Sequence, residues 1–306
     1  MIVVILLTAL LLLSYFGYWT GRGMGSFYTS CPMIISHRGV TEKFPENTIE
    51  AYKDSLKMGF KGIELDVLAS KDGIVYCSHN HQLERETKHQ GYIHQINSEK
   101  IDEMKTGKYS HPDNQIPIPR LTDVLEKLPD EFNSIDILIN NAGNAHGLDT
   151  IQDGSLDDWD NMIDSNVKGL LYVSSVIITK MIEQQSGHII NIGSLAGREV
   201  YEKGNIYCAT KHAVNAISKA MRIDLNKTGI KVSEINPGLV ETDFSNVRFK
   251  GDSDRAEKVY QGYKALQADD IADIIEFVIN RPDHVNIADI LVLPQAQATS
   301  SIIDKN

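Results

Sequence analysis

Hydrophobic and polar positions divide the chain into an uncharged start and a long remainder with α/β patterning. Residues 2–19 include no charged side chain, and the first charge belongs to Arg22. From residue 33 onward, short apolar runs alternate with amphipathic stretches. Strands that alternate with helices are typical of a parallel sheet or barrel. The pattern therefore predicts an α/β fold behind an apolar N-terminal segment.

The N-terminal segment, residues 2–19, has about the length of a membrane-spanning helix, since a bilayer core takes roughly 20 apolar residues. Tyr15, Tyr18 and Trp19 stand at its end, and such rings favour the membrane interface. A cleaved signal peptide would need a basic start and a small-residue cleavage site, and neither is clear. We therefore expect a single transmembrane helix with a linker over residues 1–25, anchoring the protein at a membrane with its remainder in the cytoplasm.

The part that follows places polar residues at the ends of predicted strands. Strands are expected over residues 33–36, 62–68 and 74–78, and a helix capped by Thr48 over residues 48–58. Glu64 and Asp66 are two residues apart on one of these strands and so share a face. With His37 and His79 at neighbouring strand ends, they suit a hard divalent cation beside an acid/base pair.

Arg38 could hold a phosphate by paired hydrogen bonds. Any one of these polar residues could be a solvated strand edge. Together they mark the carboxyl ends of strands, where barrel active sites lie.

Five motifs of this part resemble the glycerophosphodiester phosphodiesterase family: Ser-His37-Arg38-Gly39, Pro45-Glu-Asn-Thr48, Gly62-Ile-Glu64-Leu-Asp66, Lys71-Asp-Gly73 and Ser78-His79. The resemblance covers residues 33–137 and implies a partial TIM-type barrel of three strands. It implies a Mg²⁺ or Ca²⁺ ion on Glu64, Asp66 and Asp136, His37 and His79 as acid and base, and Arg38 on the phosphate. Asn80 and Leu138 depart from the family pattern, and the later barrel strands are missing.

The rest of the chain predicts a second set of alternating elements. Strands are expected over residues 135–140, 187–194, 231–235 and 290–293, and helices over residues 156–166, 167–185, 207–226 and 269–280. Tyr207 and Lys211 are four apart and share a helix face. Tyrosine titrates near ~10 and a neighbouring ammonium favours its phenolate, so Tyr207 could serve an alcohol–ketone pair as acid and base. Ser194 could bind the substrate oxygen, and Asn166 could hold a water.

This second part resembles the short-chain dehydrogenase/reductase family through Asn140-Asn-Ala142-Gly143, Asn166, Ile192-Gly-Ser194, Tyr207-x-x-x-Lys211 and Asn236-Pro237-Gly238-x-x-x-Thr242. Residues 244–251 and 284–287 further resemble the NADP-dependent 3-hydroxy acid (serine or allo-threonine) dehydrogenases. The resemblance covers residues 123–306 and implies a Rossmann-like doubly wound sheet. It implies Asn166, Ser194, Tyr207 and Lys211 as catalytic residues, and NADP bound by Asn140, Ala142, Gly143, Lys211, Pro237, Gly238 and Thr242.

The dehydrogenase family begins with a strand, a Gly-x-x-x-Gly-x-Gly turn and a helix that receives the pyrophosphate. We expect this turn to be lacking here, since the glycine cluster at residues 21–25 follows the apolar segment and is interpreted as a flexible linker. His37-Arg38-Gly39, after a strand, is then the candidate replacement for the phosphate cradle. Residues 128–137 satisfy both family patterns, so we interpret the chain as a hybrid that joins a partial barrel to a partial doubly wound sheet.

Composition and net charge limit the kinds of partner and site that this chain could have. The net charge of −11 argues against a nucleic-acid partner, which would need a basic face. The three cysteines, Cys31, Cys77 and Cys208, fit neither a disulfide framework nor a zinc site. The sequence leaves three hypotheses: an NADP-dependent oxidoreductase of small hydroxy acids, a metal-dependent phosphodiesterase of lipid metabolism, and a hybrid without activity. Homo-oligomer formation stays open.

Overall fold

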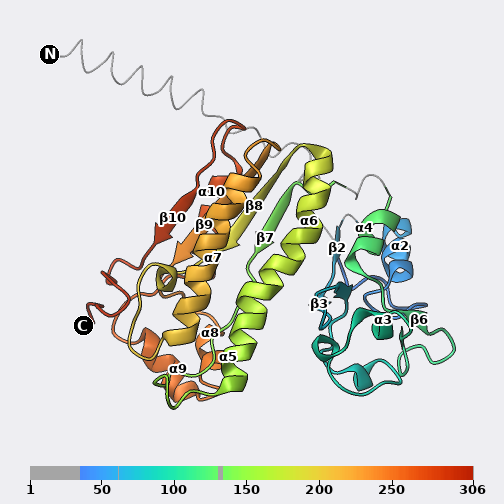
Figure 1. The fold of residues 1–306 in the computed structure, drawn as a ribbon, viewed down its shortest axis with the longest axis horizontal. Coiled ribbons are helices and arrows are strands. Elements are labelled where there is room, and N and C mark those ends of the chain that lie inside the picture. Colours follow the sequence, from blue (N-terminus) through green and yellow to red (C-terminus); the bar gives the residue numbers. More distant parts are fainter. Residues whose placement is uncertain (1–34, 61, 130–133, 306) are drawn as a thin grey trace, which may run out of the picture.

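The computed structural model describes residues 35–60, 62–129 and 134–305, which form an α/β structure with two parts (Figure 1). The second part is built on a parallel sheet with the strand order β10-β9-β8-β7. These strands are β7 (Ile137–Asn140), β8 (Gly187–Ile192), β9 (Ile230–Pro237) and β10 (Asp289–Val292). A Rossmann-like sheet is therefore confirmed, and β7 forms its edge among the described strands.

Helices cover both faces of this sheet (Figure 1). The helices of the second part are α5 (Leu156–Ile163), α6 (Leu170–Gln184), α7 (Asn205–Asp224), α8 (Phe244–Arg248), α9 (Ser253–Tyr260) and α10 (Ala268–Ile279). On β8, Ile189 packs in a cluster with α6 and α7, whereas Ile190 packs in a cluster with α10. Successive strand residues point to opposite faces, which is why two neighbouring isoleucines serve two cores.

The first part consists of short strands and helices. Its strands are β1 (Ile35–His37), β2 (Gly62–Glu64), β3 (Val67–Ala69), β4 (Val75–Cys77), β5 (Lys105–Thr106) and β6 (Ile116–Pro117), and its helices are α2 (Ile49–Lys57), α3 (Ser98–Ile101) and α4 (Leu121–Lys127). Single 3₁₀ turns lie at Leu83–Arg85 and Ile93–Gln95. Thr48 caps α2 as expected, since its hydroxyl accepts a hydrogen bond from the Ala51 N–H.

The expected three-stranded piece of a barrel is wrong in its pairing. β1 and β2 are parallel, but β3 and β4 form a separate antiparallel hairpin, and the strand expected over 62–68 is interrupted after Glu64. The reason is the turn at Lys71-Asp-Gly73, where Gly73 has a φ of +85° and Ser70 N–H bonds to the Ile74 carbonyl at 2.8 Å. So short a connection can join only antiparallel strands, because a parallel pair needs a long crossover.

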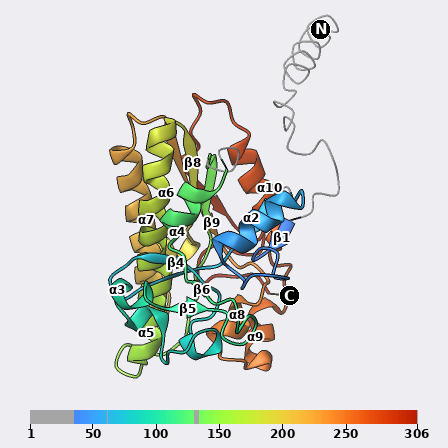
Figure 2. The same ribbon diagram turned by 90° about the vertical axis from the view of Figure 1, so that its right-hand side faces the viewer.

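One of the hydrophobic cores includes residues of both parts. Its buried residues from the first part are Tyr52, Val75, Cys77, Leu121 and Val124, and those from the second part are Leu170, Ile177, Met181, Ile189, Val214, Met221, Leu225, Ile230 and Val232. At the boundary the turn glycine Gly73 lies against α6, where an added Cβ would be 3.0 Å from the Tyr172 ring. Figures 1 and 2 show the first part lying beside α6.

The expected membrane anchor requires a correction. Within the ranges that the structure describes, no helix combines the length and apolarity needed to cross a bilayer. The transmembrane part of the fold prediction and the single-pass membrane localisation are therefore not upheld. The residues on which they rested, 2–19, lie outside the described ranges.

Candidate active site

The carboxyl ends of three neighbouring parallel strands bring the predicted dehydrogenase residues to one edge of the sheet. Asn140 ends β7, the residues 193–194 follow β8, and Pro237 ends β9. Parallel strands place these ends side by side, which is where α/β folds bind ligands. The Asn140 amide donates to Ser174 Oγ on α6 at 2.9 Å and to Asn191 Oδ1 on β8 at 2.8 Å. These bonds fix the start of the loop that holds Ala142 and Gly143.

Lys211 is held inside the protein against the end of β8. Its side chain is buried, and its Nζ donates a hydrogen bond to the Ile192 carbonyl at 2.9 Å. The backbone of Lys211 also lies close to Gly197. Glycine is required there, because an added Cβ would lie 2.7 Å from the Lys211 carbonyl oxygen. Burial lowers the pKa of Lys211 to about 8, and the negative charge of Glu234 opposes that change.

Tyr207 lies one turn before Lys211 on α7 and contacts Ser194. Burial raises the pKa of Tyr207, while the hydrogen bond with Ser194 and the positive charge of Arg248 lower it. The Tyr207 ring meets Phe244 edge-on, with ring centroids 5.6 Å apart. The lowering expected from Lys211 is not among these influences. Those that lower the pKa of Tyr207 come from Ser194 and Arg248, which sequence spacing did not reveal.

Asn166 occupies a π-helical turn, Asp164–Gly169, between α5 and α6. The sequence predicts a junction of two helices here, and the structure has one continuous helix with a local widening. Such turns recur at functional sites because they redirect a side chain. The Asn166 amide binds both backbone groups of Asn144 at 2.8 Å and donates to Thr210 Oγ1 at 3.1 Å. It therefore ties the loop after β7 to α7.

The loop after β7 forms an open cradle beside these residues. Ala142 and Gly143 are exposed, and a Cβ added to Gly143 would be 3.1 Å from Asn166 Oδ1 and 3.7 Å from Lys211 Nζ. At the end of β9, the Gly238 N–H bonds to the Val292 carbonyl at 2.7 Å, and Thr242 Oγ1 accepts from the Phe244 N–H. Asn140, Pro237 and Gly238 thus lie at the carboxyl end of the sheet.

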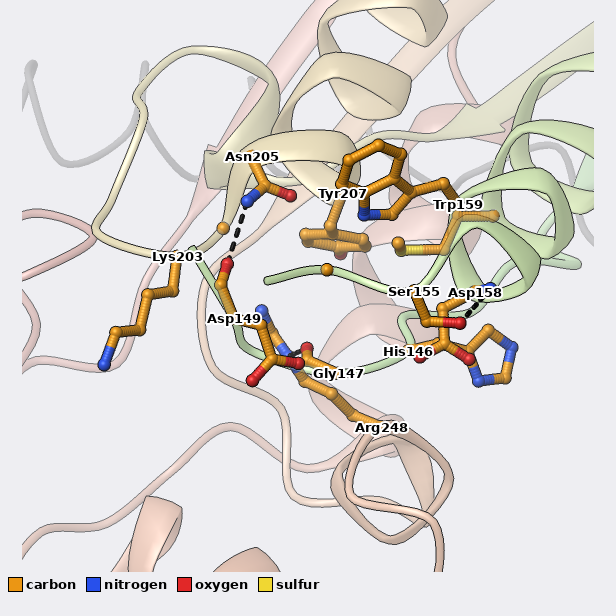
Figure 3. Close-up of a pocket in the computed structure, with 13 residues that line it drawn as sticks. His146, Gly147, Asp149, Ser155, Asp158, Trp159, Lys203, Asn205, Tyr207 and Arg248 are labelled. Atoms are coloured by element: carbon orange, nitrogen blue, oxygen red, sulfur yellow. Dashed lines mark hydrogen bonds between the residues drawn. The ribbon is translucent and has the colours of Figure 1, made fainter. Parts of the chain in front are cut away.

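A pocket opens on the Tyr207 side of the site (Figure 3). It is lined by His146, Gly147, Asp149, Gly154, Ser155, Asp158, Trp159, Met162, Lys203, Gly204, Asn205, Tyr207 and Arg248. Of these, only Tyr207 was expected from the sequence. Lys203, Gly204 and Asn205 come just before Tyr207, whereas the others lie at residues 146–162 and at Arg248, distant along the chain. The segment at residues 244–251, recognised as similar to hydroxy acid dehydrogenases, was the one signal that could have indicated Arg248.

The phosphodiesterase-like residues of the first part are engaged with one another. Arg38 Nε is 2.9 Å from Asp66 Oδ2, and Arg38 Nη1 is 3.2 Å from Glu46 Oε2. The Asn47 amide also donates to Asp66 Oδ2 at 3.1 Å. The guanidinium expected to bind phosphate therefore neutralises a carboxylate expected to bind metal.

The remaining residues of that set are more loosely placed. His37 Nε2 lies 3.8 Å from Glu64 Oε2, and both side chains are largely exposed. His79 lines a hollow of about 510 Å³ together with Asp66. Asp136 lies just before β7, where its carbonyl accepts from the His188 N–H. In the ranges that the structure describes, no three His, Cys, Asp or Glu side chains form a group that could hold a metal ion.

Comparisons with known proteins match this chain to two families. The profile of the short chain dehydrogenase family matches residues 114–253. The NADP-dependent 3-hydroxy acid dehydrogenase YdfG of Escherichia coli strain CFT073 is 45% identical over 183 residues, which are 60% of this chain and 74% of that protein. The chain belongs to the short-chain dehydrogenase family. The NADP-dependent 3-hydroxy acid dehydrogenase of Schizosaccharomyces pombe is 44% identical over 174 residues, 57% of this chain and 67% of that protein.

The same sequence also matches a second family. The profile of the glycerophosphoryl diester phosphodiesterase family matches residues 37–181, so the two matches overlap over residues 114–181. The hybrid interpretation of the sequence is therefore confirmed. Among solved structures, the closed form of serine dehydrogenase complexed with NADP⁺ is 43% identical with a TM-score of 0.57, covering 60% of this chain and 77% of that one.

The glycine turn of the dehydrogenase family needs one correction. The family spacing Gly-x-x-x-Gly-x-Gly does occur in this chain, at Gly17, Gly21 and Gly23. The linker interpretation of residues 21–25 overlooks it, because the apolar run before it was taken as a membrane span. These glycines lie outside the described residues.

Proposed function

We propose that this short-chain dehydrogenase-type oxidoreductase interconverts a small 3-hydroxy acid, or a similar small alcohol, and its carbonyl form with NADP(H). The observation that carries the proposal is the placement of Tyr207. Tyr207 contacts Ser194 and lies one helical turn before the buried Lys211 on α7. It also lines the pocket in Figure 3. The two 3-hydroxy acid dehydrogenases at 44–45% identity support the same substrate class.

In this proposal Tyr207 moves the proton of the substrate hydroxyl. A side chain placed within hydrogen-bond reach can give or take that proton as the alcohol becomes a carbonyl and back. Ser194 orients the substrate oxygen, since it already bonds with the phenol of Tyr207. Lys211 supplies a positive charge behind the pair while its protonated form persists, and Asn166 holds the loop after β7 in place.

NADP(H) would supply the hydride when bound. The described residues fit its nicotinamide and ribose end. Residues 142 and 143 are exposed, and Gly143 has no Cβ that would crowd Asn166. The Lys211 ammonium lies beside Gly143. For the pyrophosphate end, the family uses strands beyond β7 and a glycine turn, whereas β7 is the edge of the described sheet.

The phosphodiesterase alternative has less support in the geometry. It would need Mg²⁺ or Ca²⁺ on Glu64, Asp66 and Asp136, but Arg38 and Asn47 already bind Asp66. These residues do not fit the ion, and we derive no hydrolytic step from them. The proposal therefore assigns the chemistry of this chain to its second part.

The decisive experiment measures NADPH oxidation with acetoacetate by wild type and Y207F. We expect wild-type turnover and a loss of about 100-fold or more in kcat for the variant, the usual scale of general acid–base catalysis. Y109F is the matched control, since Tyr109 is 66% exposed in the first part and should leave kcat within about twofold. Equal activity of Y207F and Y109F would contradict the proposal.

A further inference from the structure

We propose that Arg248 is the residue that recognises the carboxylate of the substrate, which makes the site specific for acids over uncharged alcohols and ketones. The inference rests on the proposed function and adds to it the group that selects the substrate. Arg248 ends α8 and lines the same pocket as Tyr207 (Figure 3). Its Cζ lies 5.6 Å from the centroid of the Tyr207 ring.

Neutral groups hold the Arg248 guanidinium in place. Nε donates to the Gly147 carbonyl at 3.1 Å, and Nη1 donates to the Tyr201 hydroxyl at 2.9 Å. The guanidinium also lies over the Tyr201 ring, with Cζ 5.5 Å from its centroid. These contacts use two of its five N–H donors and fix the plane of the group. Donors therefore remain for a ligand, in an orientation that the protein has already set.

Within the part of the chain that the structure describes, no carboxylate lies within ion-pair distance of the Arg248 guanidinium. Among the ion pairs of the described residues, none includes Arg248. The pocket has two carboxylates, but Asp158 is paired with Lys250 at 2.9 Å, and Asp149 is exposed. A half-buried guanidinium without a counterion is unusual, because its desolvation is normally compensated by an anion. A substrate carboxylate would be that anion, and arginine binds carboxylates through paired hydrogen bonds.

The size of the site agrees with a small acid. The pocket has a volume of about 10 Å³, close to the space that one water needs. It can therefore accept a carboxylate oxygen, while the rest of the substrate extends across the open side toward Tyr207. The positive charge of Arg248 also lowers the pKa of Tyr207. When an acid is bound, its charge would offset this influence.

The test compares a charged substrate with an uncharged one of the same shape. Wild type, R248M and R248K are assayed for NADPH oxidation with acetoacetate and with acetoacetamide. For R248M we expect kcat/KM to fall about 10- to 100-fold with acetoacetate, mainly through KM, and less than about threefold with acetoacetamide. R248K should recover part of the loss because it keeps the charge without the paired donors.

R255M is the matched control. Arg255 lies on the neighbouring helix α9, where its guanidinium is 4.3 Å from the Phe249 ring centroid, and it does not line the pocket. We expect R255M to change kcat/KM only slightly, and by the same factor for both substrates. Equal losses for the acid and the amide in R248M would overturn the inference and leave Arg248 a structural role.

A second measurement separates this inference from the proposed function. If wild type oxidises NADPH with neither substrate, the proposed function fails. Saturation-transfer NMR with 3-hydroxybutyrate and 3-hydroxybutyramide then decides the role of Arg248. Binding of the acid by wild type, lost in R248M, supports carboxylate recognition without turnover. Equal binding to both proteins, or no binding to wild type, overturns it.

Discussion

The Lys211 ammonium donates a 2.9 Å hydrogen bond to the carbonyl of Ile192, which joins the middle of α7 to the last residue of β8. The bond holds a buried positive charge beside Tyr207, although burial disfavours that charge and lowers the pKa of Lys211 to about 8. The site therefore keeps a group that opposes folding at neutral pH. Such a conflict between stability and local chemistry is expected where a residue serves function.

Replacing Lys211 with methionine should abolish activity and raise stability at pH 7. The pKa of Lys211 falls from 10.5 to about 8 on folding, so the unfolded chain binds more protons between these values. The resulting cost to the native state is greatest below pH 8, at most about 3 kcal/mol, and fades as pH rises toward 10.5. The lost bond to Ile192 offsets about 1 kcal/mol. We expect a net gain of about 2 kcal/mol in urea unfolding at pH 7, declining toward pH 10.

K219M serves as the control for this prediction. Lys219 is on the same helix but exposed, and its Nζ bonds to Asn215 Oδ1. Its replacement should leave stability within about 0.5 kcal/mol at both pH values. A pH-independent loss of stability in K211M would show that Lys211 is a structural group rather than a strained one.

Asn166→Ala should destabilise the protein and reduce turnover together. The side chain satisfies both backbone groups of Asn144 and donates to Thr210, so its removal leaves partly buried polar groups without partners. We expect a loss of about 1–3 kcal/mol in urea unfolding and a lower kcat, because the loop after β7 is released. N161A, on the exposed face of α5, should change neither. Unaltered unfolding of N166A would exclude the tethering role.

The two parts should unfold in one transition, because they share a core. Cys77 in the first part and Cys208 in the second are both free and buried, so each reports its own part. In a C31S background, thiol labelling of the C77S and C208S variants in urea should give the same midpoint. M181A, at the shared core, should lower both midpoints equally, through a loss of about 2–5 kcal/mol in the free energy of unfolding. Two separate midpoints would show that the parts fold independently.

Reduced nicotinamide mononucleotide should replace NADPH with little loss. In the proposed function the described residues would hold only the nicotinamide and ribose end, and β7 is the edge of the described sheet. We therefore expect kcat/KM for the two reductants to differ by less than about tenfold, far below the effect of several lost phosphate contacts. A strong preference for NADPH that G21A removes would instead assign the pyrophosphate site to Gly17, Gly21 and Gly23.

Local patterns predicted much of the second part. The strand that ends at Asn140, the helix with Tyr207 and Lys211, and the strand before Gly238 all occur as expected, with boundaries shifted by a few residues. Alternation and helical period are local properties, since they follow from which face of each element is buried. The four-residue spacing of Tyr207 and Lys211 likewise sufficed to place both on one face of α7.

Other features depended on contacts between distant residues. The sequence could not show that the turn at Gly73 makes a hairpin packed on α6 instead of a barrel strand, or that Arg38 would bind Asp66. Sequence reasoning also missed Arg248, which is 41 residues from Tyr207 in the chain. The packing of α8 places its guanidinium beside the Tyr207 ring. Sequence fixes the period and the residue types of each element. Only the tertiary structure brings charges together, and their energy depends on distances and burial that no local pattern contains.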